Sequence, residues 1–278
     1  MTDQTEVVEQ EDQPKSRKRL WIGVAGVVLI ALVVGAALFW YFNRTVPEEV
    51  SLEGAVAGVT TTVTTDAEET TTSVAAESTT TAAAEETTVP GVGGVEGTWV
   101  VDTSIGEFSF EESTASFAGF RVNEELTGVG SAVAVGRTPL VAGTIVINGT
   151  TLEEAVIEAD LTGIVTNESR RDRRVQSAMG TSEFPVATFV LTEPIDLGAG
   201  AAEGEPVIAD AVGELTIKGI TQSVVIPMEA QLVDDLIVVV GSIDLVFADF
   251  NVEVPSAPVV LSADDHGIME MQLLFGRT

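Results

Sequence analysis

The chain has no cysteine and one histidine among its 278 residues. It can therefore form no disulfide, no thiol nucleophile and no cysteine-ligated or histidine-rich metal site. Basic residues are scarce as well, because 13 Lys and Arg stand against 43 Asp and Glu, for a net charge of −30. Phosphate binding needs Lys and Arg, so this balance excludes a protein that wraps nucleic acid. We expect no nucleic-acid partner, no metal and no other cofactor.

An acidic chain is seldom as apolar as this one, with 45% hydrophobic residues and a mean hydropathy of +0.32. Residues 20–42 account for part of it, because they form 23 residues without a charge. A helix of that length spans about 35 Å, enough to cross a hydrocarbon core of roughly 30 Å. Four basic residues precede it, so the positive-inside rule places residues 1–19 in the cytoplasm and the rest of the chain outside. We predict a single-pass membrane anchor, with a cleaved signal peptide ending near residues 35–37 as the alternative.

Residues 43–96 have a different composition. Between Thr45 and Glu96 there are 14 Thr and 10 acidic residues, with no Lys, Arg or aromatic residue. No helical or strand period persists there for more than a few residues, and little apolar surface is available to offset the entropy of ordering. We predict a disordered, acidic, Thr-rich stalk that acts as a spacer.

Residues 97–278 are the expected folded domain, with 28 acidic and 8 basic residues. Apolar residues alternate with period two, most clearly at Met269, Met271, Leu273 and Phe275, with Glu270 and Gln272 on the other face. The pairs Asn148-Gly149, Lys218-Gly219 and Asp234-Asp235 are typical of turns between strands. About eight strands with almost no helical period favour an all-β antiparallel barrel or sandwich.

One segment of this domain departs from the strand pattern. Residues 167–178 (NESRRDRRVQSA) begin with a candidate N-cap, Asn167, and Gly180 follows as a stop. We predict one short helix here. It carries Arg170, Arg171, Arg173 and Arg174, which are half of the basic residues of the domain.

The order of several motifs resembles the YceI-like family. These motifs are Trp99-Val100-Val101-Asp102, Thr166-Asn167-Glu168 leading to Arg171-Asp172, Phe184-Pro185-Val186-Ala187-Thr188-Phe189, and the strand from Gly213 to Thr221. The resemblance covers residues 97–278. It implies an eight-stranded antiparallel lipocalin-like barrel with a hydrophobic central cavity, a short helix near its mouth, an isoprenoid or other long apolar ligand, and no catalysis.

Large apolar side chains of the domain are the candidates for lining such a cavity, although each can equally be ordinary core. The candidates are Trp99, Phe108, Phe110, Phe117, Phe120, Phe184, Phe189, Phe247, Met269 and Met271.

The arginines of the helix allow two interpretations. Guanidinium groups match phosphate or carboxylate in a bidentate manner, so Arg170, Arg171, Arg173 and Arg174 are candidates for contacting an anionic head group. The alternative is a solvated helix face whose arginines pair with nearby carboxylates such as Asp172 and Glu168.

His266 lies close to Ser262, Asp264 and Asp265, but proximity in sequence does not make a catalytic triad. The pattern before an apolar strand is typical of a turn, and we predict no catalytic residue.

These observations lead to two hypotheses. The first is a membrane-anchored, extracytoplasmic binding protein that is not an enzyme and that encloses a lipid-like molecule in its barrel. The second is a module without a ligand, which presents the outer surface of the barrel to a partner in the cell envelope. The sequence does not determine the oligomeric state.

Overall fold

The structure of the protein is a computed structural model that describes residues 46–68, 94–255 and 257–278. The predicted anchor at 20–42, the tail at 1–19 and most of the predicted stalk lie outside these ranges. Within them, no helix has both the length and the apolar character that a membrane span requires.

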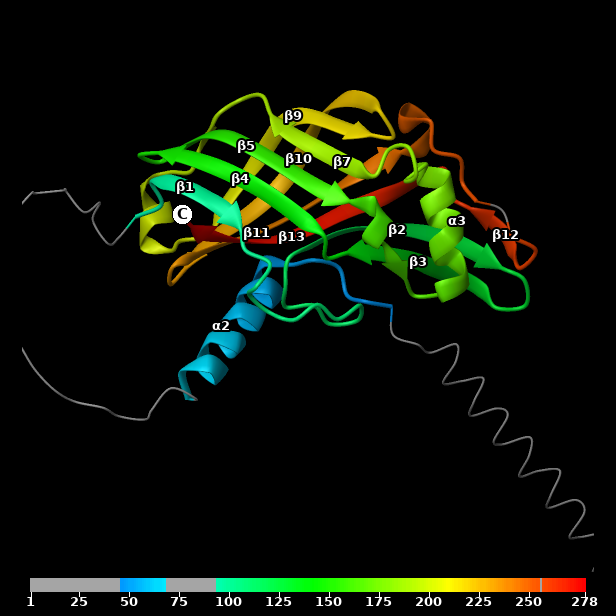
Figure 1. Cartoon of the computed structure of the whole chain (residues 1–278), viewed down its shortest axis with the longest axis horizontal. Coiled ribbons are helices and arrows are strands. Elements are labelled where there is room, and N and C mark those ends of the chain that lie inside the picture. The colour runs from blue at the N-terminus through cyan, green and yellow to red at the C-terminus, as the bar shows by residue number, and fades with distance from the viewer. Residues whose placement is uncertain (1–45, 69–93, 256) are drawn as a thin grey trace, which may run out of the picture. The chain divides into compact units, whose positions relative to one another are not determined.

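Eight antiparallel strands form a closed barrel, as expected (Figure 1). In order around the barrel they are β1 (Gly97–Val101), β4 (Val141–Asn148), β5 (Thr151–Asp160), β7 (Val186–Leu191), β9 (Val207–Ile217), β10 (Ile220–Val233), β11 (Leu236–Val246) and β13 (His266–Arg277). The long strand β13 closes the ring, because its last residues pair with β1 while its whole length pairs with β11.

Shorter strands and turns extend this ring. The first half of β13 pairs with β2, from which the sheet continues to β3 and β6, while β12 pairs with β2 and β8 with β5. Their bounds are β2 (Phe117–Leu126), β3 (Gly130–Thr138), β6 (Val165–Thr166), β8 (Ile195–Asp196) and β12 (Val260–Ala263), and the 3₁₀ turns are η1 (Leu161–Gly163), η2 (Ala199–Glu203) and η3 (Phe247–Phe250).

The turn predictions are confirmed. Lys218 and Gly219 connect β9 to β10 with φ values of 53° and 72°, and Asp234, with φ 51°, begins the turn from β10 to β11. Two successive residues with positive φ, as at Lys218 and Gly219, match the twist of the flanking strands, which is why such turns favour glycine and short polar residues.

The predicted arginine-rich helix is confirmed as α3 (Ser169–Met179), with Gly180 ending it at φ 65°. Its N-cap residue is Glu168 and not the expected Asn167. The Asn167 side chain instead binds strand β3, donating from Nδ2 to the Val133 carbonyl at 3.1 Å and accepting from the Val135 amide.

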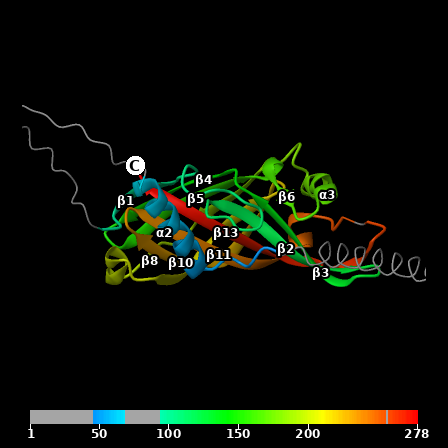
Figure 2. The same ribbon diagram turned by 90° about the horizontal axis from the view of Figure 1, so that it is seen from below.

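A second helix corrects the prediction of disorder in part of the stalk. Helix α2 (Leu52–Glu68) lies inside the segment expected to be disordered. Its residues Leu52, Ala55 and Val59 are buried against Val238, Val240 and Leu274 of the barrel. Figure 2 shows α2 crossing the outer face of the barrel over β10 and β11, close to the end of β13. Three apolar residues on one helix face thus supply a buried contact with the barrel.

Candidate functional site

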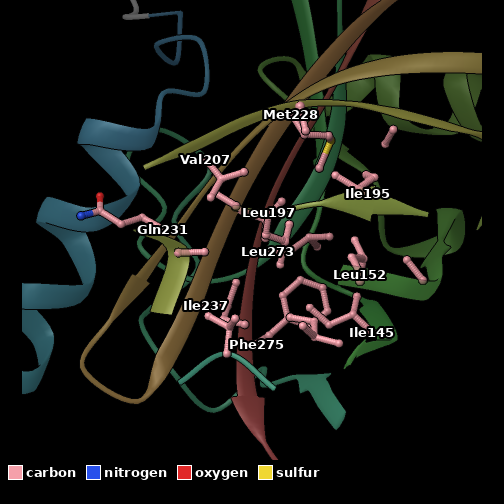
Figure 3. Close-up of a pocket in the computed structure, with 18 of the residues that line it drawn as sticks. Ile145, Leu152, Ile195, Leu197, Val207, Met228, Gln231, Ile237, Leu273 and Phe275 are labelled. Atoms are coloured by element: carbon pink, nitrogen blue, oxygen red, sulfur yellow. The ribbon is translucent and has the colours of Figure 1, made fainter. Parts of the chain in front are cut away.

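An apolar cavity of about 100 Å³ lies inside the barrel (Figure 3). Strands β4, β5, β7, β8, β9, β10, β11 and β13 contribute to its wall, together with Val95 before β1 and Ala201 in η2. Among the 24 described residues that line it, only Glu205 and Gln231 have polar side chains. Such a surface can bind apolar groups by excluding water, and it offers little to a polar molecule.

Small side chains leave this space open. Five alanines line the cavity: Ala155, Ala201, Ala209, Ala211 and Ala230. In an eight-stranded barrel the interior is just wide enough to be filled by side chains or to hold one small ligand. Alanine at these inward positions therefore favours a cavity over a filled core.

Large apolar side chains are buried in the other half of the barrel interior. Ile217, Ile226 and Phe250 are buried there, Ile226 completely. None of these three lines the cavity, which is confined to the half nearer β1 and β8. Figure 2 shows β1 and β8 at one end of the barrel and α3 at the other.

Trp99 and Arg277 close the barrel at the end of the cavity. The Trp99 ring is fully buried, and its Nε1 donates to the Val95 carbonyl at 2.9 Å. The Arg277 guanidinium lies over this ring, 4.3 Å from its centroid, where a cation–π contact is favourable. Arg277 also donates to the Glu96 carbonyl at 2.6 Å. Trp99 thus closes one end of the barrel and is not among the residues that line the cavity.

Of the ten residues predicted to line a cavity, Phe189 and Met271 lie in its wall. Trp99, Phe120 and Met269 belong to the packed core next to it. Phe117 lies under the guanidinium of Arg137, whose Cζ is 4.4 Å from the centroid of the phenylalanine ring. Phe108, Phe110, Phe184 and Phe247 are half-buried elsewhere. The cavity wall consists mainly of aliphatic residues, whereas most of the candidates predicted from the sequence were aromatic.

The α3 arginines do not line the cavity. Arg171 is paired with Glu124 of β2 at 2.6 Å and donates to Asn167 Oδ1 at 2.7 Å. Burial raises the pKa of Glu124, and the charge of Arg171 opposes that rise. Arg170, Arg173 and Arg174 are exposed and form no ion pair with any described residue. The expected pairing of the arginines with carboxylates is thus present at one position, through Glu124 and not through Asp172 or Glu168.

A buried charged cluster on the outer face of the barrel was not expected from the sequence. Glu270 of β13, 1% exposed, accepts from Arg121 of β2 at 2.7 Å and from Arg137 of β3 at 2.9 Å. Burial lowers the pKa of the Arg137 guanidinium, while its ion pair with Glu270 opposes that effect. One carboxylate thus faces two arginines, which also donate to the backbone carbonyls of Pro47 and Glu48.

His266 lies at the start of β13, directly after the turn that the sequence predicted. Its Nδ1 is 3.1 Å from Asp265 Oδ1, and Nε2 is 3.9 Å from Asp244 Oδ2. The hydrogen bond to Asp265 and the charge of Asp244 raise the pKa of His266. Across residues 46–68 and 94–278, Ser256 excepted, no group of three or more His, Asp and Glu side chains could hold a metal ion.

The model of one protein family matches most of the barrel domain. The family model for the YceI-like domain matches residues 99–269. A solved polyisoprenoid binding domain from Saccharophagus degradans, implicated in plant cell wall breakdown, is 20% identical, with a TM-score of 0.49 over 66% of this chain and 100% of that one.

Two further solved structures show weaker similarity. BcnA from Burkholderia cenocepacia is 16% identical, with a TM-score of 0.44 over 56% of this chain and 95% of that one. A YCEI protein from Campylobacter jejuni is 15% identical, with a TM-score of 0.42 over 51% and 84%. No curated protein matches the chain.

Substituting Glu270→Gln tests the buried cluster. The substitution leaves two buried guanidinium groups without an anion, so we expect it to lower the free energy of unfolding by about 3–5 kcal/mol. Urea unfolding of the full-length protein in mild detergent measures this loss. The matched control is Glu229→Gln on the exposed face of β10, for which we expect a change within about 0.5 kcal/mol. Equal stability of the two variants would contradict the role of the cluster.

The single histidine gives a direct pH test. We expect NMR titration of His266 to show a pKa above its ordinary value of about 6.5, and Asp265→Asn to bring it back toward that value. A raised pKa means that the folded state binds the proton more tightly than the unfolded state. The resulting stabilisation is therefore complete at acidic pH, below about 6.5, and is lost as the pH rises through the pKa of the folded state. A His266 pKa at or below 6.5 would contradict the contacts with Asp265 and Asp244.

Proposed function

The chain belongs to the YceI-like family, and from that premise we propose that it binds a lipid-like apolar molecule inside its barrel without changing it chemically. The cavity is the observation that carries this proposal. Its wall is apolar, it lies within the barrel, and five alanines keep it open. Burial of apolar ligand surface, worth about 25 cal/mol per Å², supplies the affinity. A module that only presents its outer surface to a partner needs no such space. The cavity therefore favours a protein that encloses a ligand.

The location of the protein is part of the same proposal. Residues 20–42 anchor the chain in the cell membrane, residues 1–19 remain in the cytoplasm, and the barrel lies on the extracytoplasmic side. The length of the uncharged segment and the four basic residues before it support this arrangement. A ligand-binding barrel that is anchored in a membrane lies close to lipid-like molecules.

Filling the cavity tests the binding function. Ala230→Leu places three extra carbon atoms in the cavity, and we expect at least a tenfold loss of affinity for the neutral apolar alcohol decanol, with the fold retained. Ala142→Leu is the matched control, because Ala142 is exposed on β4. Isothermal titration calorimetry gives both affinities. Unchanged binding by Ala230→Leu, or equal losses in both variants, would count against the cavity as the site.

Introducing charge tests the anchor. Leu29→Arg together with Leu32→Arg adds about 5–7 kcal/mol to the cost of inserting residues 20–42, so we expect the protein to leave the membrane fraction. Val7→Arg with Val8→Arg adds the same charge outside the segment and leaves the protein membrane-bound. Fractionation of cells after an alkaline wash measures the distribution. A double Leu variant that stays in the membrane would refute the anchor.

A further inference from the structure

We infer that the ligand is a short apolar chain with an uncharged or positively charged end, and that this end lies beside Glu205. The inference rests on the proposed function, since it concerns the same cavity. It follows from two separate observations, the extent of the cavity and the charge of its wall.

The extent of the cavity limits the length of the chain. A volume of about 100 Å³ is small beside the roughly 300–1,000 Å³ of typical ligand pockets. To lengthen along the barrel it would have to displace Ile217, Ile226 and Phe250, which are buried in the same core and do not line it. Met228 and Met271 in the wall have flexible side chains that can adjust to a guest. A chain longer than the cavity must therefore leave carbon atoms in water or disrupt the core.

The charge of the wall limits the end of the chain. Glu205 is the one ionisable group among the described residues that line the cavity. The other polar side chain, Gln231, already donates from Nε2 to the Gly204 carbonyl at 2.9 Å. Figure 3 shows the Gln231 amide directed away from the other labelled side chains. An anionic end would thus meet a carboxylate and no free donor from these side chains.

The basic residues of the domain do not alter this balance. Arg277 is at the same end of the barrel, but its guanidinium covers Trp99 and donates to the carbonyls of Gly94 and Glu96. The exposed arginines of α3 are at the other end (Figure 2). The net charge of −20 over residues 97–278 adds a general repulsion of anions.

The turn η2 holds Glu205 at the cavity. Gly198 and Gly204, with φ values of 73° and 79°, allow the chain to fold over so that Ala201 is buried in the cavity wall. The Glu205 amide donates to the Gly200 carbonyl at 3.0 Å. A side chain at position 200 would collide with the Glu205 carboxylate, so the glycine leaves room for it. Glu205 itself is exposed, which places it where a ligand's end would meet water.

Three probes of equal chain length test the charge preference. Isothermal titration calorimetry measures the binding of decylamine, decanol and decanoate to the full-length protein in mild detergent at low salt and pH 7.5. We expect decylamine and decanol to bind more tightly than decanoate. Glu205→Gln should weaken decylamine two- to fivefold, strengthen decanoate two- to fivefold and leave decanol unchanged, as expected for a partly exposed charge pair. The matched control is Glu203→Gln, because Glu203 is an exposed residue of η2 that does not line the cavity.

A series of alcohols tests the length limit. Each buried methylene raises affinity about fourfold, so we expect a rise from hexanol to decanol and no further rise from dodecanol to hexadecanol. A continued rise to hexadecanol would overturn the limit on length. Equal responses of Glu205→Gln and Glu203→Gln would overturn the role of Glu205. In either of those cases decanol still binds, whereas failure of all the alcohols to bind would count against the proposed function itself.

Discussion

The contact of Glu270 with Arg121 and Arg137 determines how the outer face of β13 is covered. One carboxylate and two guanidinium groups are buried together, so one positive charge is left over. The backbone carbonyls of Pro47 and Glu48 accept from these arginines and partly offset it. Taking charges out of water costs several kcal/mol per ion, so the buried arginines depend on their hydrogen bonds to those carbonyls. The segment leading into α2 is thereby bound to the barrel at a defined position.

The same chemistry recurs elsewhere in the domain. Arg277 donates to two carbonyls of the segment before β1, and Lys218 donates to the carbonyls of Ala178 and Asn251. In each case a basic side chain binds carbonyl groups of a connecting segment or of the last turn of α3, where strand pairing does not satisfy them. Five of the eight basic residues of the domain, counting Arg171 with its ion pair, are thus committed to internal contacts. The three exposed arginines of α3 remain, and the acidic surface is otherwise uncompensated.

Periodicity and turn chemistry predicted about eight antiparallel strands, and the resemblance to the YceI-like family predicted that they form a barrel. Met271, Leu273 and Phe275 share one face of β13 and line the cavity, as their alternation predicts. Alternation could not predict that Glu270, on the opposite face, is buried, because that depends on segments far away in the sequence. The same limit applies to α2, whose glycines and threonines are poor helix formers. Leu52, Ala55 and Val59 form a short apolar face that is stabilised by packing against the barrel surface, and the sequence pattern alone does not show that surface.

The candidate site was harder to predict than the fold, for a physical reason. Both a filled core and a cavity wall are made of inward-facing apolar residues, so apolar character does not distinguish them. The difference lies in volume, since alanines such as Ala209 and Ala230 leave a space that Ile226 and Phe250 fill in the other half. Aromatic residues contribute the most volume per side chain, and in this barrel most of them pack beside the cavity or outside it. Inward-facing alanines on neighbouring strands are therefore a better indication of a cavity than large apolar residues, because a barrel that could be filled is left partly empty at those positions.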